Sequence, residues 1–161
     1  MDAMENENYP LRLDKQLCFA LYVCSKEIIR LYKPLIGPLG LTYTSYITMM
    51  ALWEKDNISV NELGSKLYLD SGTLTPLLKK MEGQGLLTRT RSKTDERTVI
   101  ITLTDKGREL EAKCSSVPEK MVCTAKIDPK KGINLLQELH TLLSSLVEVN
   151  DDEEIPELLR K

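Results

Sequence analysis

The chain has 161 residues and a mass of 18.3 kDa, which is the length of one ordinary domain with a buried core. Its 42% hydrophobic and 29% charged residues exclude collagen-like, low-complexity and wholly disordered proteins. The formal net charge of -2 at first argues against a nucleic-acid-binding protein, because such proteins are usually basic.

The acids are concentrated near the end of the chain. Six of the 24 acids and no base lie between Glu148 and Glu157, so the rest of the chain holds 22 bases against 18 acids. The segment Lys79–Arg97 alone has six bases and three acids. A charge run is usually a solvated face, so its meaning depends on the element that carries it.

The sequence contains no run of the roughly 18 apolar residues that a membrane span needs, and Met1–Pro10 is acidic where a signal peptide is basic and then apolar. We therefore expect a cytoplasmic protein without membrane contact. The four cysteines form no C-x-x-C pair and the chain has one histidine, so we expect no metal site and no cofactor. The default for each thiol in a reducing cytosol is a buried small hydrophobe.

A first helix is predicted from about Leu13 to Tyr32, and it is expected to end before Pro34. One apolar stripe recurs at spacings of four and three along Leu17, Leu21, Cys24, Ile28 and Leu31. A second stripe lies beside it along Cys18, Tyr22, Ser25, Ile29 and Tyr32. This face is wider than one neighbouring helix covers, which indicates packing between subunits.

Three shorter helices are predicted next. Thr42 is expected to cap the first of them, which ends at Asp56–Asn57 and has the inner face Tyr46, Met49, Met50 and Trp53.

The other two helices form a pair. Ser59 and Glu62 form a predicted capping box for a helix with Val60, Leu63 and Leu67 inward. After a turn at Tyr68–Leu69, Asp70 is expected to cap a helix that buries Leu74, Leu77, Leu78 and Met81 and ends before Gly85. This arrangement is typical of a helix-turn-helix.

A β-hairpin follows, with strands at Leu87–Arg91 and Val99–Leu103 around the polar loop Ser92–Glu96. A further helix is predicted from Asp105 with an interruption near Pro118, and a last one from Pro129 to about Asn150. The predicted fold is therefore mainly α with a small β-hairpin wing, which is a winged helix-turn-helix.

This arrangement places the basic segment on the two elements that contact DNA in such folds. Hydroxyls and lysines can bond base edges or phosphates, and a wing-tip arginine can enter a narrow minor groove. We expect Asp95 to orient the guanidinium of Arg97. The alternative is a solvated hairpin beside a capped surface helix. The candidate DNA-binding residues are Ser71, Gly72, Thr73, Thr75, Lys79, Arg89, Arg91, Lys93, Asp95 and Arg97.

The segments Leu69–Lys80, Asp95–Arg97 and Lys15–Tyr22 together resemble the MarR family of winged-helix regulators, and are most similar to its organic-hydroperoxide-sensing, OhrR-type branch. The resemblance extends from about Leu11 to Leu110. It implies a homodimer intertwined through the first and last helices. Composition adds a polar arm at residues 1–12 and an acidic tail at 150–161. Between them we expect one domain at 13–149, with dimerisation helices at 13–40 and 105–149 flanking a DNA-binding lobe at 42–104.

In the sensing branch the resemblance makes Cys18 the thiol that reacts with peroxide, Tyr22 and Tyr32 its hydrogen-bonding tyrosines, and Tyr43 a near neighbour. It makes Arg97 the minor-groove arginine. The spacing adds an independent argument, because 14 residues of helix separate Cys18 from Tyr32 by about 21 Å, so these side chains can meet only across a dimer. The alternative is that the tyrosines are dimer-core aromatics and Cys18 is a packing residue.

The expected function is a repressor that binds a pseudo-palindromic DNA operator as a dimer and is released when an organic hydroperoxide oxidises Cys18. The resemblance leaves two routes open after oxidation: Cys18 is capped by a small thiol or overoxidised, or it forms a disulfide with a C-terminal cysteine of the partner subunit. For the second route Cys123 is preferred to Cys114 as the resolving cysteine, and Cys24 is expected in the core. One alternative is a MarR-type regulator that responds to a small phenolic or other ligand in the dimer cleft, and another is an interaction module that does not bind DNA. A thiol peroxidase is disfavoured because thioredoxin-like folds need several parallel strands and this chain offers one hairpin.

Overall fold

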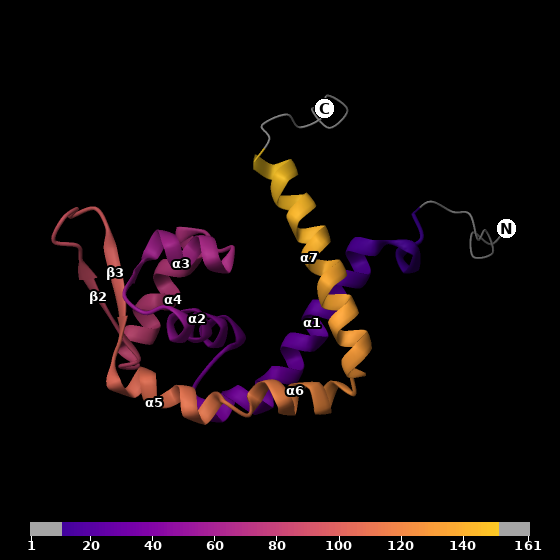
Figure 1. Cartoon of the computed structure of the whole chain (residues 1–161), viewed down its shortest axis with the longest axis horizontal. Helices are drawn as coiled ribbons and strands as arrows, with labels where there is room; N and C mark the ends of the chain where they lie inside the picture. Colours follow the sequence, from indigo (N-terminus) through magenta and orange to yellow (C-terminus); the bar gives the residue numbers. More distant parts are fainter. Residues whose placement is uncertain (1–10, 152–161) are drawn as a thin grey trace. The chain divides into compact units, whose positions relative to one another are not determined.

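The computed structural model describes residues 11–151 (Figure 1). It divides into two compact units, one ending at Met121 and the other beginning at Val122. The predicted polar arm at residues 1–12 and the acidic tail at residues 150–161 lie largely outside the described residues.

The first long helix, α1, spans Leu17–Ile36 and follows a 3-10 turn at Leu13–Lys15. The prediction that it ends before Pro34 is wrong. Proline lacks one helical hydrogen bond, but its fixed φ suits a helix, and the chain turns away only at the 3-10 turn Gly37–Leu39. Gly40 then takes a left-handed φ of 77°, which a glycine adopts without strain.

Helix α2 spans Tyr43–Glu54 and begins as predicted at Thr42, whose side chain exchanges capping hydrogen bonds with Ser45. Its predicted inner face is wrong at Met50, which is 38% exposed. The buried line runs instead through Tyr46, Met49 and Leu52, because the core lies on that side of the helix.

Helices α3, at Val60–Leu67, and α4, at Ser71–Gly83, form the predicted helix-turn-helix. The Ser59 hydroxyl accepts from the Glu62 amide at 3.0 Å, but the Glu62 carboxylate pairs with Lys55 at 2.6 Å instead of closing the capping box. Gly85 follows α4 with a φ of 73°, as predicted for a residue just beyond a helix.

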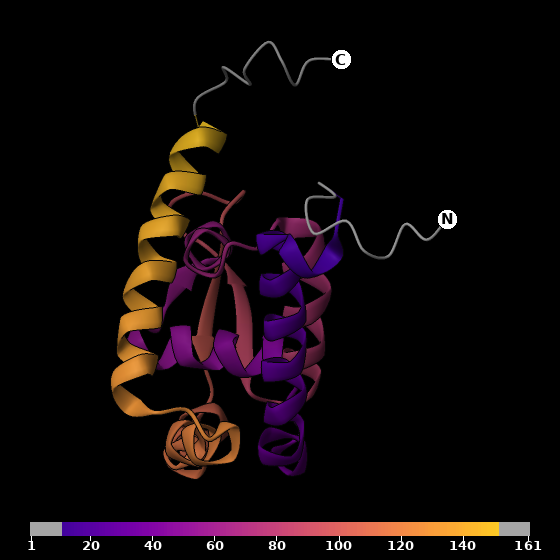
Figure 2. The same cartoon turned by 90° about the vertical axis from the view of Figure 1, so that its right-hand side faces the viewer.

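The hairpin consists of β2, at Leu87–Arg91, and β3, at Val99–Leu103, as predicted. A two-residue strand, β1 at Ile58–Ser59, adds to it in the antiparallel order β1-β3-β2. This strand was not predicted because two residues are too few to show alternation. Figures 1 and 2 show the hairpin running past one side of α3 and α4.

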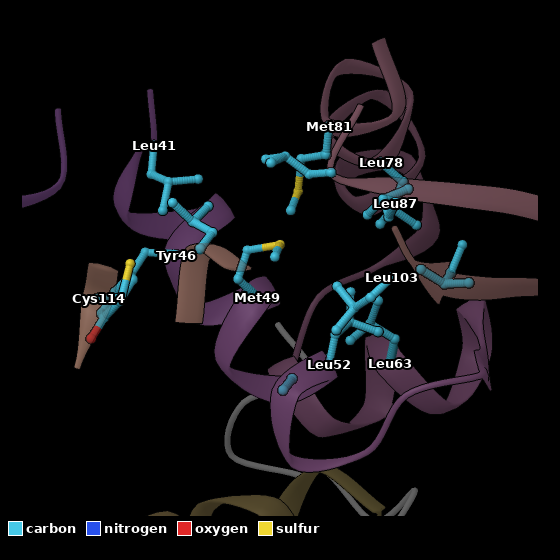
Figure 3. Close-up of a cluster of buried hydrophobic side chains, with 14 of the residues drawn as sticks. Leu41, Tyr46, Met49, Leu52, Leu63, Leu78, Met81, Leu87, Leu103 and Cys114 are labelled. Atoms are coloured by element: carbon cyan, nitrogen blue, oxygen red, sulfur yellow. The ribbon is translucent and has the colours of Figure 1, made fainter. Parts of the chain in front are cut away.

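The core joins these elements into one lobe (Figure 3). Helices α2, α3 and α4 and strands β2 and β3 all contribute fully buried side chains: Met49, Leu52, Leu63, Leu74, Leu78, Met81, Leu87 and Ile101. The sheet and the helix-turn-helix are therefore held as one body, so the wing has a fixed place beside the second helix of the pair.

Helix α5 spans Asp105–Cys114, and the expected interruption near Pro118 is confirmed because α6, at Val117–Ala125, begins after a short break. The Trp53 indole donates to the Gly107 carbonyl at 3.0 Å and so joins α2 to α5. In the second unit, α7 spans Pro129–Asp151.

Between residues 11 and 151, no single helix is long and apolar enough to cross a membrane. One bent pair, Leu17–Leu39 with Tyr43–Glu54, passes by length and composition but turns by 72° at its break.

Candidate functional site

The exposed face of α4 carries most of the predicted DNA-binding residues of this helix. Ser71, Gly72, Thr73 and Lys79 are exposed, and Thr75 is half-buried. The opposite face is fully buried in the core through Leu74, Leu78 and Met81. The helix therefore presents hydroxyls in its first turns and a lysine further along, as the sequence indicates.

The N-terminus of α4 is capped by the carboxylate of Asp70. Asp70 accepts from the Thr73 amide and from the Thr73 hydroxyl, both at 2.9 Å. The amide hydrogen bond, aided by the hydroxyl, lowers the pKa of Asp70, so this group stays ionised. A Cβ at Gly72 would lie 2.9 Å from Asp70 Oδ1. Gly72 thus makes room for the cap, and the capping carboxylate counters the attraction of this helix end for a phosphate.

A hollow of about 190 Å³ connects the helix-turn-helix with the wing. Thr75 of α4 and two arginines of the hairpin, Arg89 and Arg97, line it. The structure therefore brings together predicted residues that are up to 22 positions apart in the sequence. Asn61 of α3 lines the same hollow and was not predicted, because only the folded hairpin places it beside the wing.

Arg89 differs from the other wing bases. Its guanidinium donates to Glu82 of α4 at 2.9 Å, and its backbone amide donates to the same carboxylate at 3.0 Å. These bonds from Arg89 lower the pKa of Glu82. Arg89 thus fastens the wing to α4, whereas Arg91 and Lys93 are exposed.

The tip of the wing is a tight turn. The Asp95 carboxylate accepts from the Thr98 hydroxyl at 2.8 Å and from the Arg97 backbone amide at 3.0 Å. The Thr98 hydroxyl, followed by the Arg97 amide, lowers the pKa of Asp95. The expectation that Asp95 holds the Arg97 guanidinium is wrong, since its carboxylate instead fixes the backbone that carries the exposed Arg97 side chain.

The predicted sensor thiol lies at the start of α1. Cys18 is exposed, and Tyr22, one helical turn further along, is 62% exposed. Cys18 and Tyr32 occupy the same continuous helix, so their separation is about 21 Å along its axis. A single chain therefore keeps these two side chains apart.

Tyr32 and Tyr43 are brought together by the turn between α1 and α2. Their ring centroids lie 5.0 Å apart, and Tyr32 also packs on Tyr46 at 5.8 Å. Burial, and secondly the neighbouring Tyr43, raises the pKa of Tyr32. Its hydroxyl therefore remains protonated at neutral pH and can donate a hydrogen bond to an anion.

The other cysteines differ in exposure. Cys114 is buried beside Tyr46 (Figure 3), and burial raises the pKa of its thiol, which disfavours the reactive thiolate. Cys123 of α6 is exposed. Cys24 is also exposed on α1, so the expectation that it lies in the core is wrong for the single chain.

Sequence comparison places these features in a known family. Residues 30–114 match the family model "Transcriptional regulator SarA/Rot". The chain is 44% identical over 147 residues to the "Organic hydroperoxide resistance transcriptional regulator" of Bacillus subtilis, an alignment that covers 91% of this chain and 100% of that protein. The chain belongs to the MarR family of winged-helix regulators, in its organic-hydroperoxide-sensing branch.

Solved structures of AbfR from Staphylococcus epidermidis have the same fold as this MarR-family chain. Reduced AbfR bound to DNA is 34% identical, with a TM-score of 0.70 over 85% of this chain and 96% of that one. Disulfide-formed AbfR is 35% identical, with a TM-score of 0.58 over 82% of this chain and 93% of that one. The predicted winged-helix fold is thereby confirmed.

Proposed function

We propose that the protein is a redox-sensing transcriptional repressor that binds a pseudo-palindromic DNA operator as a homodimer and is released when an organic hydroperoxide oxidises Cys18. The observation that carries this proposal is an exposed thiol on α1 in a chain whose other half is a winged helix-turn-helix. The relatives support it, because one is named for organic hydroperoxide resistance and another has been solved with DNA and as a disulfide. These relatives are regulators and not enzymes, and they do not favour a phenolic ligand as the signal. A regulator of this kind acts in the cytoplasm, where its DNA is.

The DNA-binding half of the mechanism uses α4 and the wing. Ser71, Thr75 and Lys79 face the major groove, while Arg97, set on the turn that Asp95 fixes, reaches the minor groove. Arg91 and Lys93 contact phosphates. Two such lobes in a dimer read half-sites one helical turn of DNA apart.

The sensing half is completed by the second subunit. Antiparallel crossing of two α1 helices brings Cys18 of one protomer towards Tyr32 and Tyr43 of its partner, which a single chain cannot do. Tyrosine hydroxyls that donate to the sulfur favour the thiolate, which is the form that attacks peroxides. One thiol reacts with one peroxide, so the oxidation is stoichiometric and the protein acts as a sensor and not as an enzyme.

Oxidation of Cys18 removes the hydrogen bonds that the tyrosine hydroxyls donate to its thiolate. The sulfenic acid formed on Cys18 is larger and uncharged, so the hydrogen bonds to the thiolate are lost and the spacing of the two lobes shifts. The exposed Cys123 thiol then attacks the sulfenic acid of Cys18 in the other subunit, so that an S–S bond forms, the S–O bond breaks and water leaves, whereas Cys114 is shielded by burial.

A gel shift on the promoter of the protein's own gene tests the proposal. We expect reduced wild-type protein to bind, and cumene hydroperoxide to release it. Cys18→Ser should bind the DNA and stay bound when the peroxide is added. The matched variant Cys24→Ser, altered six residues away on the same helix, should be released like wild type. Normal release of Cys18→Ser by peroxide would contradict the sensing role of this thiol.

A non-reducing gel of peroxide-treated wild type, Cys114→Ser and Cys123→Ser tests the resolving role of Cys123. We expect peroxide to produce a covalent dimer in the wild type and in Cys114→Ser but not in Cys123→Ser. A covalent dimer that persists in Cys123→Ser contradicts the assignment.

A further inference from the structure

Tyr68, the residue that caps the C-terminal end of α3, has a backbone conformation that tyrosine rarely adopts. Its φ of 53° and ψ of 41° lie in the left-handed region, which glycine enters freely and a large side chain does not. The turn requires this conformation, because the Tyr68 amide donates back to the Gly64 and Ser65 carbonyls and so ends the helix. Glycine would end the helix with less strain.

Packing does not explain the tyrosine either. Tyr68 is 67% exposed, so its ring is not held in the core. Within residues 11–151 its hydroxyl forms no hydrogen bond. A strained backbone that persists under a large, exposed side chain indicates that the side chain serves a function other than folding.

A hollow of about 410 Å³ lies beside Tyr68, between α3 and the first turn of α4. None of the described residues that line it is charged. The Asp70 carboxylate is not among them and is held by Thr73. Four lining side chains carry a hydroxyl or an amide, and within residues 11–151 these side chains form no hydrogen bond: Asn61, Ser65, Tyr68 and Ser71. Neutral donors of these types commonly bind the phosphates of DNA.

The hollow beside Tyr68 is continuous with the DNA-binding face. It shares Val60 and Asn61 with the hollow beside the wing, which Thr75 and Arg97 line. Ser71, another predicted DNA-binding residue, lines the hollow beside Tyr68 itself. Tyr68 therefore lies on the same surface as the predicted DNA-binding residues of α4 and the wing.

We propose that Tyr68 is a further DNA-binding residue, and that the hollow beside it holds a phosphate of the operator backbone. The Tyr68 and Ser71 hydroxyls and the Asn61 amide donate to the phosphate oxygens. Because the contact is made to a phosphate, Tyr68 positions α4 in the major groove and does not read the bases. The inference rests on the DNA-binding half of the function proposed above.

The test measures the affinity of the full chain for a duplex from the promoter of its own gene, by fluorescence anisotropy at several salt concentrations. Tyr68→Phe keeps the ring and removes only the hydroxyl. We expect it to bind about tenfold more weakly, since a hydrogen bond to a charged group is lost. The slope of affinity against salt should stay at its wild-type value, because a neutral donor releases no counterion.

Tyr68→Gly separates a contact with DNA from a structural role. Glycine adopts the left-handed φ without strain, so we expect a urea midpoint of unfolding at or above that of wild type, together with weaker DNA binding. Lys126→Gly is the matched control, because Lys126 is exposed and has a left-handed φ of 52° outside the helix-turn-helix. The control should bind the duplex with wild-type affinity.

Duplexes in which one phosphate at a time is replaced by an uncharged methylphosphonate locate the contact. We expect one position in each half-site at which the replacement weakens binding of the wild type but does not weaken binding of Tyr68→Phe any further. If the two losses add at every position, the phosphate contact is excluded.

Equal affinities of wild type and Tyr68→Phe would overturn the role of Tyr68 in DNA binding. A Tyr68→Gly variant that loses stability and affinity together would overturn it as well, because the tyrosine would then be structural. If the wild type does not bind the promoter duplex at all, the proposed function itself fails.

Discussion

At the scale of single residues, the arginines of the wing differ in their surroundings even though they lie on the same hairpin. Arg97 is exposed on a turn that other groups hold in place, while Arg89 is held by Glu82. The sequence shows both as wing arginines and cannot separate them, because the difference comes from a carboxylate on another element.

Arg97→Ala should therefore weaken operator binding without changing the fold. We expect a loss of about tenfold in affinity, and a shallower salt dependence, since one cationic contact is removed. Fluorescence anisotropy on operator DNA at several salt concentrations measures both. Arg89→Ala is the matched comparison and should lower the urea midpoint of unfolding, because Glu82 loses its partner. A larger loss of stability for Arg97→Ala than for Arg89→Ala contradicts this division.

Gly107 is the residue at which a single added methyl group should matter most. Its Cβ would lie 2.1 Å from the Leu86 carbonyl oxygen, so the start of α5 would have to move away from the residue that precedes β2. Gly107→Ala should cost about 2–3 kcal/mol of unfolding free energy, measured by urea denaturation. The control is Gly83→Ala, where nothing lies within 4 Å of the added atom and where alanine should be neutral or stabilising. Equal stability of the two variants would refute the packing argument.

At the scale of elements, the local signals predicted structure well and the contacts between elements were missed. Thr42, Asp70 and Gly85 mark helix ends by their own chemistry, and the alternation of Val99, Ile101 and Leu103 marks a strand. The errors at Met50 and at the Asp95 carboxylate each depended on a neighbour that spacing alone does not identify, while the error at Pro34 arose because a proline can remain inside a helix. The resemblance already implied that Tyr43 lies near the sensing residues, and the structure adds that its ring packs on Tyr32.

The loop before β1 joins three elements through Asp56. This carboxylate accepts from the Leu103 amide at 2.8 Å and pairs with Arg108 of α5. Partial burial by itself would raise the pKa of Asp56, but the hydrogen bonds from Leu103, Arg108 and Asn57 outweigh it and lower the pKa below its ordinary value of 3.8. The ionised form is therefore the one that the folded protein favours.

Asp56→Asn should consequently be less stable than wild type at neutral pH, and the difference should shrink in acid. The contribution of Asp56 is fully present above pH 3.8 and is lost as the pH falls through the lower pKa of the folded state. Urea denaturation at pH 7, 4 and 3 measures it. Glu109→Gln, which removes an exposed carboxylate from α5, is the control, and its difference in stability from the wild type should not change with pH. A difference that stays constant with pH would mean that Asp56 acts through its shape and not its charge.

At the scale of the whole molecule, α1 and α7 expose apolar faces that a single chain leaves in water. On α7 the exposed apolar side chains are Ile133, Leu135, Leu136, Leu139, Leu143 and Leu146. Exposed apolar surface of this extent marks an interaction site. The proposed homodimer covers these faces.

Leu136→Glu/Leu143→Glu should shift the protein towards monomers, because burying two carboxylates in an apolar interface is unfavourable. Analytical ultracentrifugation across a concentration series measures the change. The control, Asn134→Glu/Thr141→Glu, adds two charges at the same spacing on the other side of α7 and should leave the assembly unchanged. Unchanged dimers in the leucine variant would exclude this face from the interface.

The length of α1 has a genetic consequence. Its 20 residues keep Cys18 about 21 Å from Tyr32 of its own chain, so in the proposed dimer each sensing site takes its thiol from one subunit and Tyr32 from the other. A cell that carries one allele without Cys18 and another without Tyr32 forms mixed dimers with one intact site and one site lacking both groups. Two alleles that each fail to respond to peroxide should therefore restore the response when they are expressed together. A single allele that carries both changes should not restore it.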